Sequence, residues 1–180
     1  MHMRVLIGTR MEKMAQAQIL FLAAISCALI PGQSSLIETR GLTKGAANRV
    51  FTFGNGTYEI STSMAGWVQA KNDCRSKGMK LLSIESAEEN NAMLEQIVLR
   101  PGDSFWTSGS DLGHEGNFYW EATGLAVSGF KYWAPGQPDN AQSGSEHCLE
   151  ISAADNHLWN DNKCDVQHFY ICESHPCEEK

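Results

Sequence analysis

The feature that most limits how this chain can fold is a dense group of oxygen-bearing side chains in its last third, with Cys148 and Cys164 among them. The five side chains are Gln137, Asp139, Glu146, Asn160 and Asp161. Hard divalent cations such as Ca²⁺ prefer carboxylate and amide oxygens, and a disulfide would hold the loops that carry these oxygens together. The pattern predicts a calcium-dependent binding site rather than a catalytic one.

Length and charge narrow the possible partners. The chain has 180 residues, and its formal net charge is -7. This length allows one domain of about 130 to 150 residues with short extensions. A nucleic-acid partner would need a basic stripe, and the sequence contains no block of Lys and Arg, so we expect no nucleic-acid binding.

The first 32 residues have the organisation of a secretory signal peptide. Basic residues precede an apolar run of 12 residues, 19–30, and Pro31-Gly32 follows it. A membrane-spanning helix needs roughly 20 apolar residues, whereas a signal peptide needs fewer. We therefore expect residues 1–32 to be a signal peptide, no membrane span, and a secreted, extracellular protein. A signal anchor or a buried helix is the alternative.

The cysteines gain meaning from this location. Cys27 lies in the expected signal, and five others remain: Cys74, Cys148, Cys164, Cys172 and Cys177. An oxidising compartment favours disulfides, so two bonds and one leftover thiol are expected. Any four of these cysteines allow three pairings.

A zinc cluster is the rival interpretation of the last cysteines. His168, Cys172, His175 and Cys177 are residue types that bind zinc, but their spacing is irregular. The oxidising compartment favours disulfides over this cluster.

The first half of the expected mature chain contains a hairpin and a helix. Residues 33–50 have few apolar side chains and are expected to be a flexible lead. Strand-like residues flank Gly54-Asn55-Gly56, which predicts a hairpin, and Asn55 begins a glycosylation sequon. Trp67, Ala70 and Cys74 share a helical spacing, so a helix is expected over 64–77, with Gly78 as its stop.

A second helix is expected after a short apolar strand at 81–84. Ser86 and Glu89 have the spacing of a capping box. The helix should run to about Leu99, with Leu94, Ile97 and Val98 on its apolar side, and Pro101-Gly102 should end it.

Beyond residue 103 the helical periodicity disappears. Short strand-like runs occur at 105–106, 118–120, 130–133, 149–151 and 169–172, separated by Gly, Asn, Asp and Ser. Two early helices followed by short strands predict an α+β fold. The loop from Ala134 to Cys148 is long, and long ordered loops usually carry function.

Catalysis is not expected. The sequence has six histidines and many serines, but it contains neither Gly-x-Ser-x-Gly nor His-Glu-x-x-His. His114-Glu115 is an isolated pair in a Gly-rich stretch, which is typical of a solvated turn.

Taken in order, these motifs resemble the C-type lectin-like domain over residues 51–174, followed by a tail at 175–180. The motifs are Tyr58, the helix 67–74, residues 78–84, Trp106-Thr107-Ser108-Gly109, Gln137-Pro138-Asp139, Glu146-x-Cys148, Trp159-Asn160-Asp161 and the stretch 164–172. The resemblance implies two helices packed on small antiparallel sheets with a long calcium-binding loop region. The sequence of residues 106–111 is also similar to that of secreted insect lectins.

The resemblance further implies how cysteines and ligands are used. It pairs Cys74 with Cys172 and Cys148 with Cys164, and it makes this the short form of the domain. It assigns calcium binding and sugar binding to the same side chains, namely Gln137, Asp139, Glu146, Asn160 and Asp161. It also implies a cis bond before Pro138.

The sugar preference implied by Gln137-Pro138-Asp139 is of the galactose type. Galactose-binding members often carry an aromatic residue at the position of Ala141, and this chain lacks it. Carboxylates that often form an accessory calcium site are replaced here by Asn140 and His147. One calcium site and at most a weak second site are therefore expected.

The resemblance implies a secreted lectin that recognises microbial or cell-surface glycans in innate immunity. The alternative is a lectin-like domain that binds a protein or another surface ligand without sugar specificity. Cys177, left without a partner, suggests a covalent homodimer, because unpaired secreted cysteines often bond between chains.

Overall fold

The computed structural model describes residues 48–98 and 100–175. The expected signal peptide, most of the expected lead and Cys177 lie outside these residues. Within the described residues, no helix is long and apolar enough to cross a membrane.

The chain enters the fold through the expected hairpin. Strand β1 (Arg49–Phe53) pairs antiparallel with β2 (Gly56–Ile60), with Phe53 opposite Gly56. The two turn residues are Gly54 and Asn55, whereas an Asn-Gly turn would use Asn55 and Gly56. The turn lies one position earlier because Gly54 adopts the positive φ, +57°. The strand begins at Arg49, so the expected lead 33–50 overlaps the domain by two residues.

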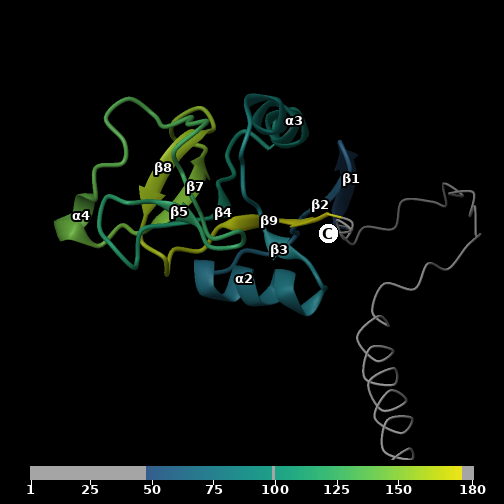
Figure 1. The fold of residues 1–180 in the computed structure, drawn as a ribbon, viewed down its shortest axis with the longest axis horizontal. Coiled ribbons are helices and arrows are strands. Elements are labelled where there is room, and N and C mark those ends of the chain that lie inside the picture. The colour runs from purple at the N-terminus through teal and green to yellow at the C-terminus, as the bar shows by residue number, and fades with distance from the viewer. Residues whose placement is uncertain (1–47, 99, 176–180) are drawn as a thin grey trace, which may run out of the picture. The chain divides into compact units, whose positions relative to one another are not determined.

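Strand β9 (Phe169–Ser174) lies at the centre of the fold (Figure 1). It pairs antiparallel with β2 on one side and with β3 (Lys80–Leu81) on the other. Helices α2 and α3 lie on opposite sides of it (Figure 1). The last strand therefore joins segments from the start of the domain, and its side chains face both helices.

Helix α2 covers Trp67–Ser76, a shorter span than the expected 64–77. The first residues of the expected span are not helical, because Ala65 exchanges backbone hydrogen bonds with His168 and Gly66 is extended at the N-cap. Trp67, Ala70 and Cys74 are buried, as the periodicity predicts. The helix ends before Gly78, whose φ is +70°.

Helix α3 covers Ala87–Ile97. Ser86 is the N-cap and accepts a hydrogen bond from Glu89 N, which confirms half of the capping box. The other half is wrong, because the Glu89 carboxylate accepts from Glu85 N and from Tyr58 Oη instead.

The buried face of α3 also differs from the expected one. Met93 and Ile97 are fully buried and Leu94 is partly buried, whereas Val98 is 60% exposed. Val98, the C-cap, keeps helical φ and ψ, and it lies about 100° around the helix axis from the buried Ile97.

A second group of strands carries the loop region. β4 (Phe105–Ser110), β5 (Tyr119–Trp120) and β6 (Leu125–Ala126) pair in sequence. β4 also pairs antiparallel with β7 (Cys148–Ser152), which pairs with β8 (Leu158–Asn162). Strand β8 contains the Trp-Asn-Asp motif, and the short apolar runs did not predict it.

The two groups of strands meet where β4 pairs with β9. This pairing is parallel, with Phe105 opposite Phe169 and Trp106 opposite Tyr170. The expectation of antiparallel sheets is therefore incomplete, because one two-residue parallel contact links them. The expected strand at 130–133 does not form, and only Trp133 makes an isolated bridge, to Trp159.

Aromatic side chains fill the core on both sides of this junction. Trp67, Trp106 and Trp159 are fully buried, as expected of core residues. Trp159 meets Trp120, Phe130 and Trp133 edge to face. This packing holds β8, the strand that carries Asp161, against the rest of the domain.

Two disulfides connect the elements, and both match the pairings that the resemblance implies. Cys74 bonds Cys172, which joins α2 to β9. Cys148 bonds Cys164, which joins the start of β7 to the segment after β8. Three of these cysteines are fully buried, and Cys164 packs beside them partly buried.

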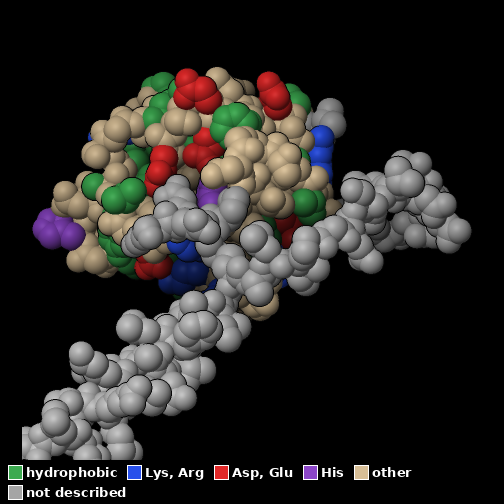
Figure 2. Space-filling model, turned by 45° about the vertical axis from the view of Figure 1, so that its right-hand side comes forward, with side chains coloured by type: hydrophobic (Ala, Val, Ile, Leu, Met, Phe, Trp, Pro, Cys, Tyr) green, Lys and Arg blue, Asp and Glu red, His purple; other side chains and the backbone are tan. Residues whose placement is uncertain are grey.

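The surface carries charged, polar and apolar side chains without a single dominant kind. On the face drawn in Figure 2, acidic side chains and small separate hydrophobic groups lie among polar atoms. The large hydrophobic side chains that the described residues expose come from separate elements, for example Val50, Val68 and Leu125. Scattered apolar residues of this kind are normal on a soluble domain.

Candidate metal site in the loop region

The loop from Ala134 to Cys148 is shaped by unusual backbone conformations. The Gln137–Pro138 bond is cis, as the resemblance implies, and Asn140 has a φ of +44°. A short helix, α4 (Ala141–Gly144), follows. This turn brings residues 137–139 beside strand β8, which lies next to the far end of the same loop.

Three of the five predicted ligands gather here. Asp139, Glu146 and Asp161 each offer a carboxylate oxygen, and these oxygens lie within 4.8 Å of one another. Glu146 and Asp161 are buried, and Asp139 is exposed. The group is therefore anchored in the protein and open to solvent on one side.

Backbone amides hold Asp161 in place. Its carboxylate accepts from Asp139 N at 3.1 Å and from Asn140 N at 2.8 Å. Burial raises the pKa of Asp161 above its ordinary value, and the charge of Asp139 adds to the rise, while the amide donors oppose it. A cation bound between these carboxylates would offset the burial of negative charge.

Gln137 supplies the test of whether the site fits calcium. Its Oε1 is buried, and no donor among the described residues reaches it. Buried carbonyl oxygens almost always have a partner, so this one is available to a hydrogen-bond donor or a cation. Gln137 stands two residues before Asp139 in the same turn, and an amide oxygen together with three carboxylates is a donor set that fits Ca²⁺.

Asn160 makes different contacts. Its Nδ2 donates to Glu150 Oε1 at 2.9 Å, because the two residues lie opposite each other in the β7–β8 ladder. Its neighbours Trp159 and Asp161 are buried on the other face of the strand, as strand alternation requires. The structure thus brings Asn160 beside Glu150, and its role as a calcium ligand stays a prediction.

Glu150 is a residue that the sequence patterns did not single out. It is buried, and it also accepts from Asn162 and forms an ion pair with His168 at 2.7 Å. Burial acts to raise the pKa of Glu150, but the hydrogen bonds from His168 and Asn160 outweigh it and hold the pKa below its ordinary value. The charged carboxylate therefore fixes the polar face of β8, next to the metal site.

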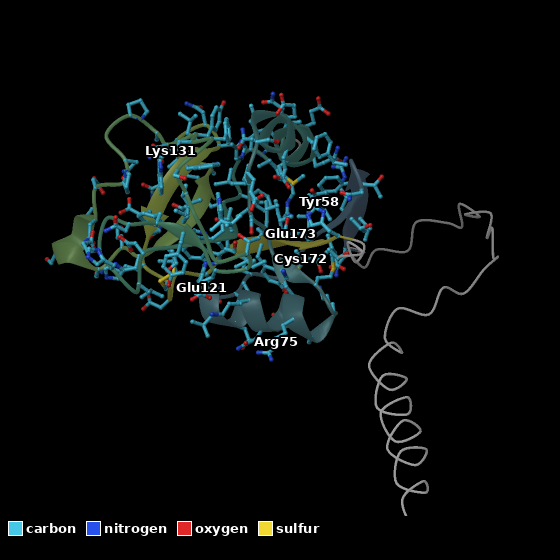
Figure 3. The ribbon with its side chains drawn as sticks, viewed as in Figure 1. Tyr58, Arg75, Glu121, Lys131, Cys172 and Glu173 are labelled. Carbon is cyan, nitrogen blue, oxygen red and sulfur yellow. A yellow bond between two sulfur atoms is a disulfide. The ribbon has the colours of Figure 1, made fainter. Side chains whose placement is uncertain are left out.

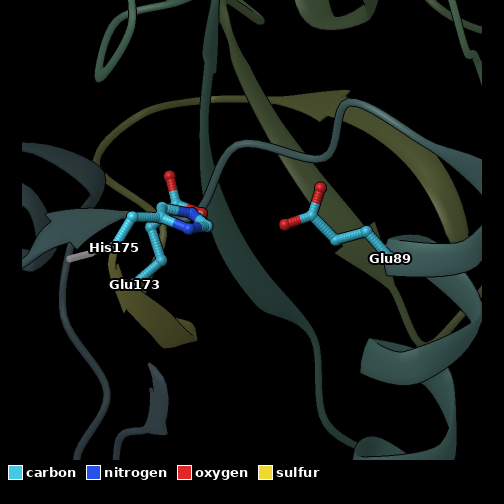
Figure 4. Close-up of side chains that lie close together, drawn as sticks. All are labelled: Glu89, Glu173 and His175. Atoms are coloured by element: carbon cyan, nitrogen blue, oxygen red, sulfur yellow. Dashed lines mark ion pairs between the residues drawn. The ribbon is translucent and has the colours of Figure 1, made fainter. Parts of the chain in front are cut away.

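A second carboxylate group lies at β9 and α3, away from the loops (Figures 3 and 4). Glu89, Glu173 and His175 offer atoms within 4.8 Å of one another. Glu173 also accepts from Ser83 N at 3.1 Å, and Glu89 from Tyr58 Oη at 2.8 Å. Burial, with the charge of Glu89, raises the pKa of Glu173 to about 8.

The rival zinc cluster at the C-terminus is wrong for one of its members. Cys172 is bonded to Cys74 and has no thiolate to offer a metal. His168 forms an ion pair with Glu150 instead, and Cys177 lies outside the described residues.

Comparison with known proteins agrees with this geometry. The family model described as Lectin C-type domain matches residues 63–174. C-type lectin domain family 4 member M from Hylobates lar is 38% identical over 125 residues, which cover 68% of this chain and 30% of that protein. Lectin subunit alpha from Sarcophaga peregrina is 36% identical over 125 residues, which cover 64% of this chain and 44% of that protein.

Solved structures show the same fold. The carbohydrate-recognition domain of mouse scavenger receptor C-type lectin has a TM-score of 0.63 and 30% identity, and the match covers 73% of this chain and 97% of that domain. The lectin CEL-I from Cucumaria echinata has a TM-score of 0.63 and 26% identity, with coverages of 69% and 93%.

The chain therefore belongs to the C-type lectin domain family, and its fold is the α+β fold of that family. It spans less than half the length of the two sequence relatives described above.

Proposed function

We propose that this protein is a secreted, calcium-dependent carbohydrate-binding protein with a preference for galactose-type sugars. The observation that carries the proposal is the loop site itself. Three carboxylates from the loop and β8 meet within 4.8 Å. In the same loop, the buried Gln137 Oε1 has no donor among the described residues.

Different atoms of the loop site would bind the ion and the sugar. Asp139, Glu146, Asp161 and Gln137 would hold the ion, with Asn160 as a predicted further ligand. The bound ion supplies positive charge and open coordination positions for two neighbouring sugar hydroxyls. Carboxylate oxygens accept the hydroxyl protons, and the side-chain N–H of Gln137 donates to a hydroxyl oxygen.

The order of these groups supports a galactose-type preference. An amide at 137 and a carboxylate at 139 place a donor and an acceptor in a fixed order along the cis turn. Reversing that order would suit hydroxyls of a different geometry. Ala141 offers no aromatic face to the sugar, so hydrogen bonds and the ion supply most of the affinity.

Microbial or cell-surface glycans are the proposed targets, and innate immune recognition the proposed process. The relatives described above include a lectin subunit from Sarcophaga peregrina, which supports a lectin role. A domain that binds a protein without sugar remains the second candidate. The complete cluster of acidic ligands favours the first, because a protein ligand requires no such cluster.

The test uses the purified mature protein on galactose resin. We expect retention with calcium, release with EDTA, and elution by free galactose at lower concentration than by mannose. Asp139→Ala removes a ligand that is exposed and should abolish retention while the far-UV circular dichroism is unchanged. Asp165→Ala is the matched control, because Asp165 is also exposed and lies outside the cluster.

Calorimetry with calcium separates the two candidates. Calcium uptake without retention on galactose or on a broad glycan array would favour a protein ligand. If the wild-type protein takes up no calcium at millimolar concentration, the proposed function is wrong.

A further inference from the structure

A third group of side chains that could hold a metal ion lies near the loop site, at the start of the turn after β4. Asp111, Glu115 and His147 offer ligand atoms within 4.8 Å of one another. His147 Nδ1 lies 3.1 Å from Asp111 Oδ1 and 3.3 Å from Glu115 Oε2. One imidazole nitrogen thus faces two carboxylates that come from a separate segment of the chain.

The backbone builds this arrangement in advance. Asp111 N donates to the carbonyl of His147 at 3.2 Å, and His147 N donates to Asn162 O at 3.1 Å. Asp111 is 2% exposed, and its Oδ2 accepts from Gly116 N at 2.7 Å. Gly116 has a φ of +76°, which closes the turn and returns Glu115 toward His147. Only Glu115 retains freedom, since its side chain is 54% exposed.

The donor set does not suit calcium. Ca²⁺ takes oxygen ligands, whereas imidazole nitrogen together with carboxylate oxygen is a set that Zn²⁺ and related transition metals prefer. Asn140, the nearby amide, does not supply the missing oxygen, because its Oδ1 accepts from Glu146 N at 3.0 Å. The imidazole nitrogen of His147 therefore favours a transition metal over calcium in this group.

The spacing of the atoms fits a tetrahedral ion. Ligand atoms about 2.0 Å from a tetrahedral centre lie about 3.3 Å from one another. The two distances from His147 Nδ1, 3.1 and 3.3 Å, are close to that edge length. Two carboxylates balance the charge of a divalent ion, and solvent reaches the side of Glu115, where a fourth ligand would sit.

From these contacts we propose that Asp111, Glu115 and His147 form a site for a transition-metal ion of the Zn²⁺ class, distinct from the calcium site and selective against calcium. It has three protein ligands and one exchangeable position. Metal titration distinguishes this site from hydrogen bonds between the His147 ring and the two carboxylates.

The experiment titrates Co²⁺ into the purified mature protein without a polyhistidine tag and in excess calcium. We expect one equivalent of Co²⁺ to give visible absorption of a four-coordinate site with a nitrogen ligand. Zn²⁺ should remove this absorption, and further calcium should leave it unchanged. No Co²⁺ uptake, or displacement by calcium, would overturn the proposal.

Variants assign the signal to these residues. His147→Ala should lower the Zn²⁺ affinity at least about 100-fold, since even outer partners of a metal site are worth about 10 to 100-fold. Glu115→Gln, at an exposed position that tolerates change, should also weaken binding and covers the case in which His147→Ala does not fold. An unchanged affinity in a folded His147→Ala variant, or in Glu115→Gln if His147→Ala does not fold, would contradict the assignment.

Two other histidines are matched controls. His114 lies in the same turn, where its ring contacts Asn117, and His175 belongs to the cluster with Glu89 and Glu173. His114→Ala and His175→Ala should each retain the Co²⁺ absorption. Loss of the signal in either one would move the metal elsewhere and overturn the proposal.

A final variant tests selectivity directly. His147→Asp replaces nitrogen with oxygen, so it should lose the Co²⁺ signal and raise the calcium stoichiometry from one to two. None of these measurements uses a sugar. Their failure therefore leaves the proposed lectin function untouched, and failure on galactose resin leaves this site untouched.

Discussion

The loop region and the β9 region contain similar carboxylate groups that their surroundings treat in opposite ways. In the loops, Asp161 is held by two backbone N–H donors, and Gln137 in the same loop has a buried amide oxygen that lacks a donor among the described residues. At β9, Glu173 has one backbone donor and lies beside the charge of Glu89, and its pKa is raised to about 8. The loop group is the proposed cation site, whereas the surroundings of Glu173 favour its protonated form.

The number of acidic residues in a group therefore does not define a binding site. What matters is whether the backbone supplies donors, whether solvent reaches one side, and whether a neighbouring charge is neutralised. Each region also has its own disulfide, Cys148–Cys164 in the loops and Cys74–Cys172 at β9. Unfolding and calcium-binding experiments test this contrast between the two regions.

The largest expected effect is the pH dependence that Glu173 imposes on stability. Its pKa is about 8 in the folded protein against 4.5 as the ordinary value, so unfolding releases a proton between these pH values. The free energy of unfolding should therefore fall as the pH rises through this window, by at most about 5 kcal/mol. Glu173→Gln should remove this fall.

Denaturant unfolding in EDTA at several pH values measures this fall in the free energy of unfolding. The comparison is the wild type minus Glu173→Gln, with exposed Glu95→Gln as the control, because Glu95 does not act on Glu173. Parallel pH curves for wild type and Glu173→Gln would show that the β9 group holds no proton, and the contrast with the loops would fail.

The next effect concerns the two disulfides. The bonded cysteines are 98 residues apart for Cys74–Cys172 and 16 apart for Cys148–Cys164. In the chain-entropy model, loops of these sizes contribute on the order of 4.7 and 3 kcal/mol. Replacing both cysteines of a pair by Ala should therefore destabilise the protein more for the β9 pair.

The readout includes calcium affinity as well as unfolding. Loss of Cys148–Cys164 should weaken calcium binding, because this bond lies between Glu146 and the segment after Asp161. Loss of Cys74–Cys172 should lower stability and leave the calcium affinity of the folded protein near that of the wild type. Equal effects of both pairs on calcium would mean that the two regions are not independent.

The smallest expected loss of stability comes from removing the Tyr58 hydroxyl. Its hydroxyl donates to Glu89 at 2.8 Å, and burial raises the pKa of Tyr58 above its ordinary value. Tyr58→Phe leaves a buried carboxylate oxygen without this donor and should cost about 1 to 3 kcal/mol. Tyr132→Phe is the control, because the Tyr132 hydroxyl makes no hydrogen bond to the described residues. Thermal or denaturant unfolding that finds equal losses for both would remove Tyr58 from the β9 group.

Much of the local structure could be predicted from the sequence. Spacings of three and four residues placed Trp67, Ala70 and Cys74 on the buried face of α2, and Gly78 marked its end. These patterns succeed because they depend on neighbours within one or two helical turns. The order of motifs along the chain also placed Gln137, Asp139, Glu146 and Asp161, three of which meet as a carboxylate cluster.

Predictions that needed distant partners were less accurate. Helix α2 starts late because Ala65 is paired with His168 from the far end of the chain. The Glu89 carboxylate leaves the capping box for Tyr58, a residue of another element. Asn160 donates to Glu150 because the β7–β8 register sets them opposite each other, which no spacing within one strand can indicate.

The order of residues alone indicated the family of the domain, the two helices, the cysteines that bond and three carboxylates that meet in the loops, because these are short-range patterns or a fixed succession of motifs. The three-dimensional arrangement was needed to show that Glu89 lies against Glu173 and that His147 lies between Asp111 and Glu115. The physical reason is that the charge state of a buried side chain, and the metal it selects, depend on groups within a few ångströms. Those groups are brought together by strand pairing and turns, not by their distance along the chain.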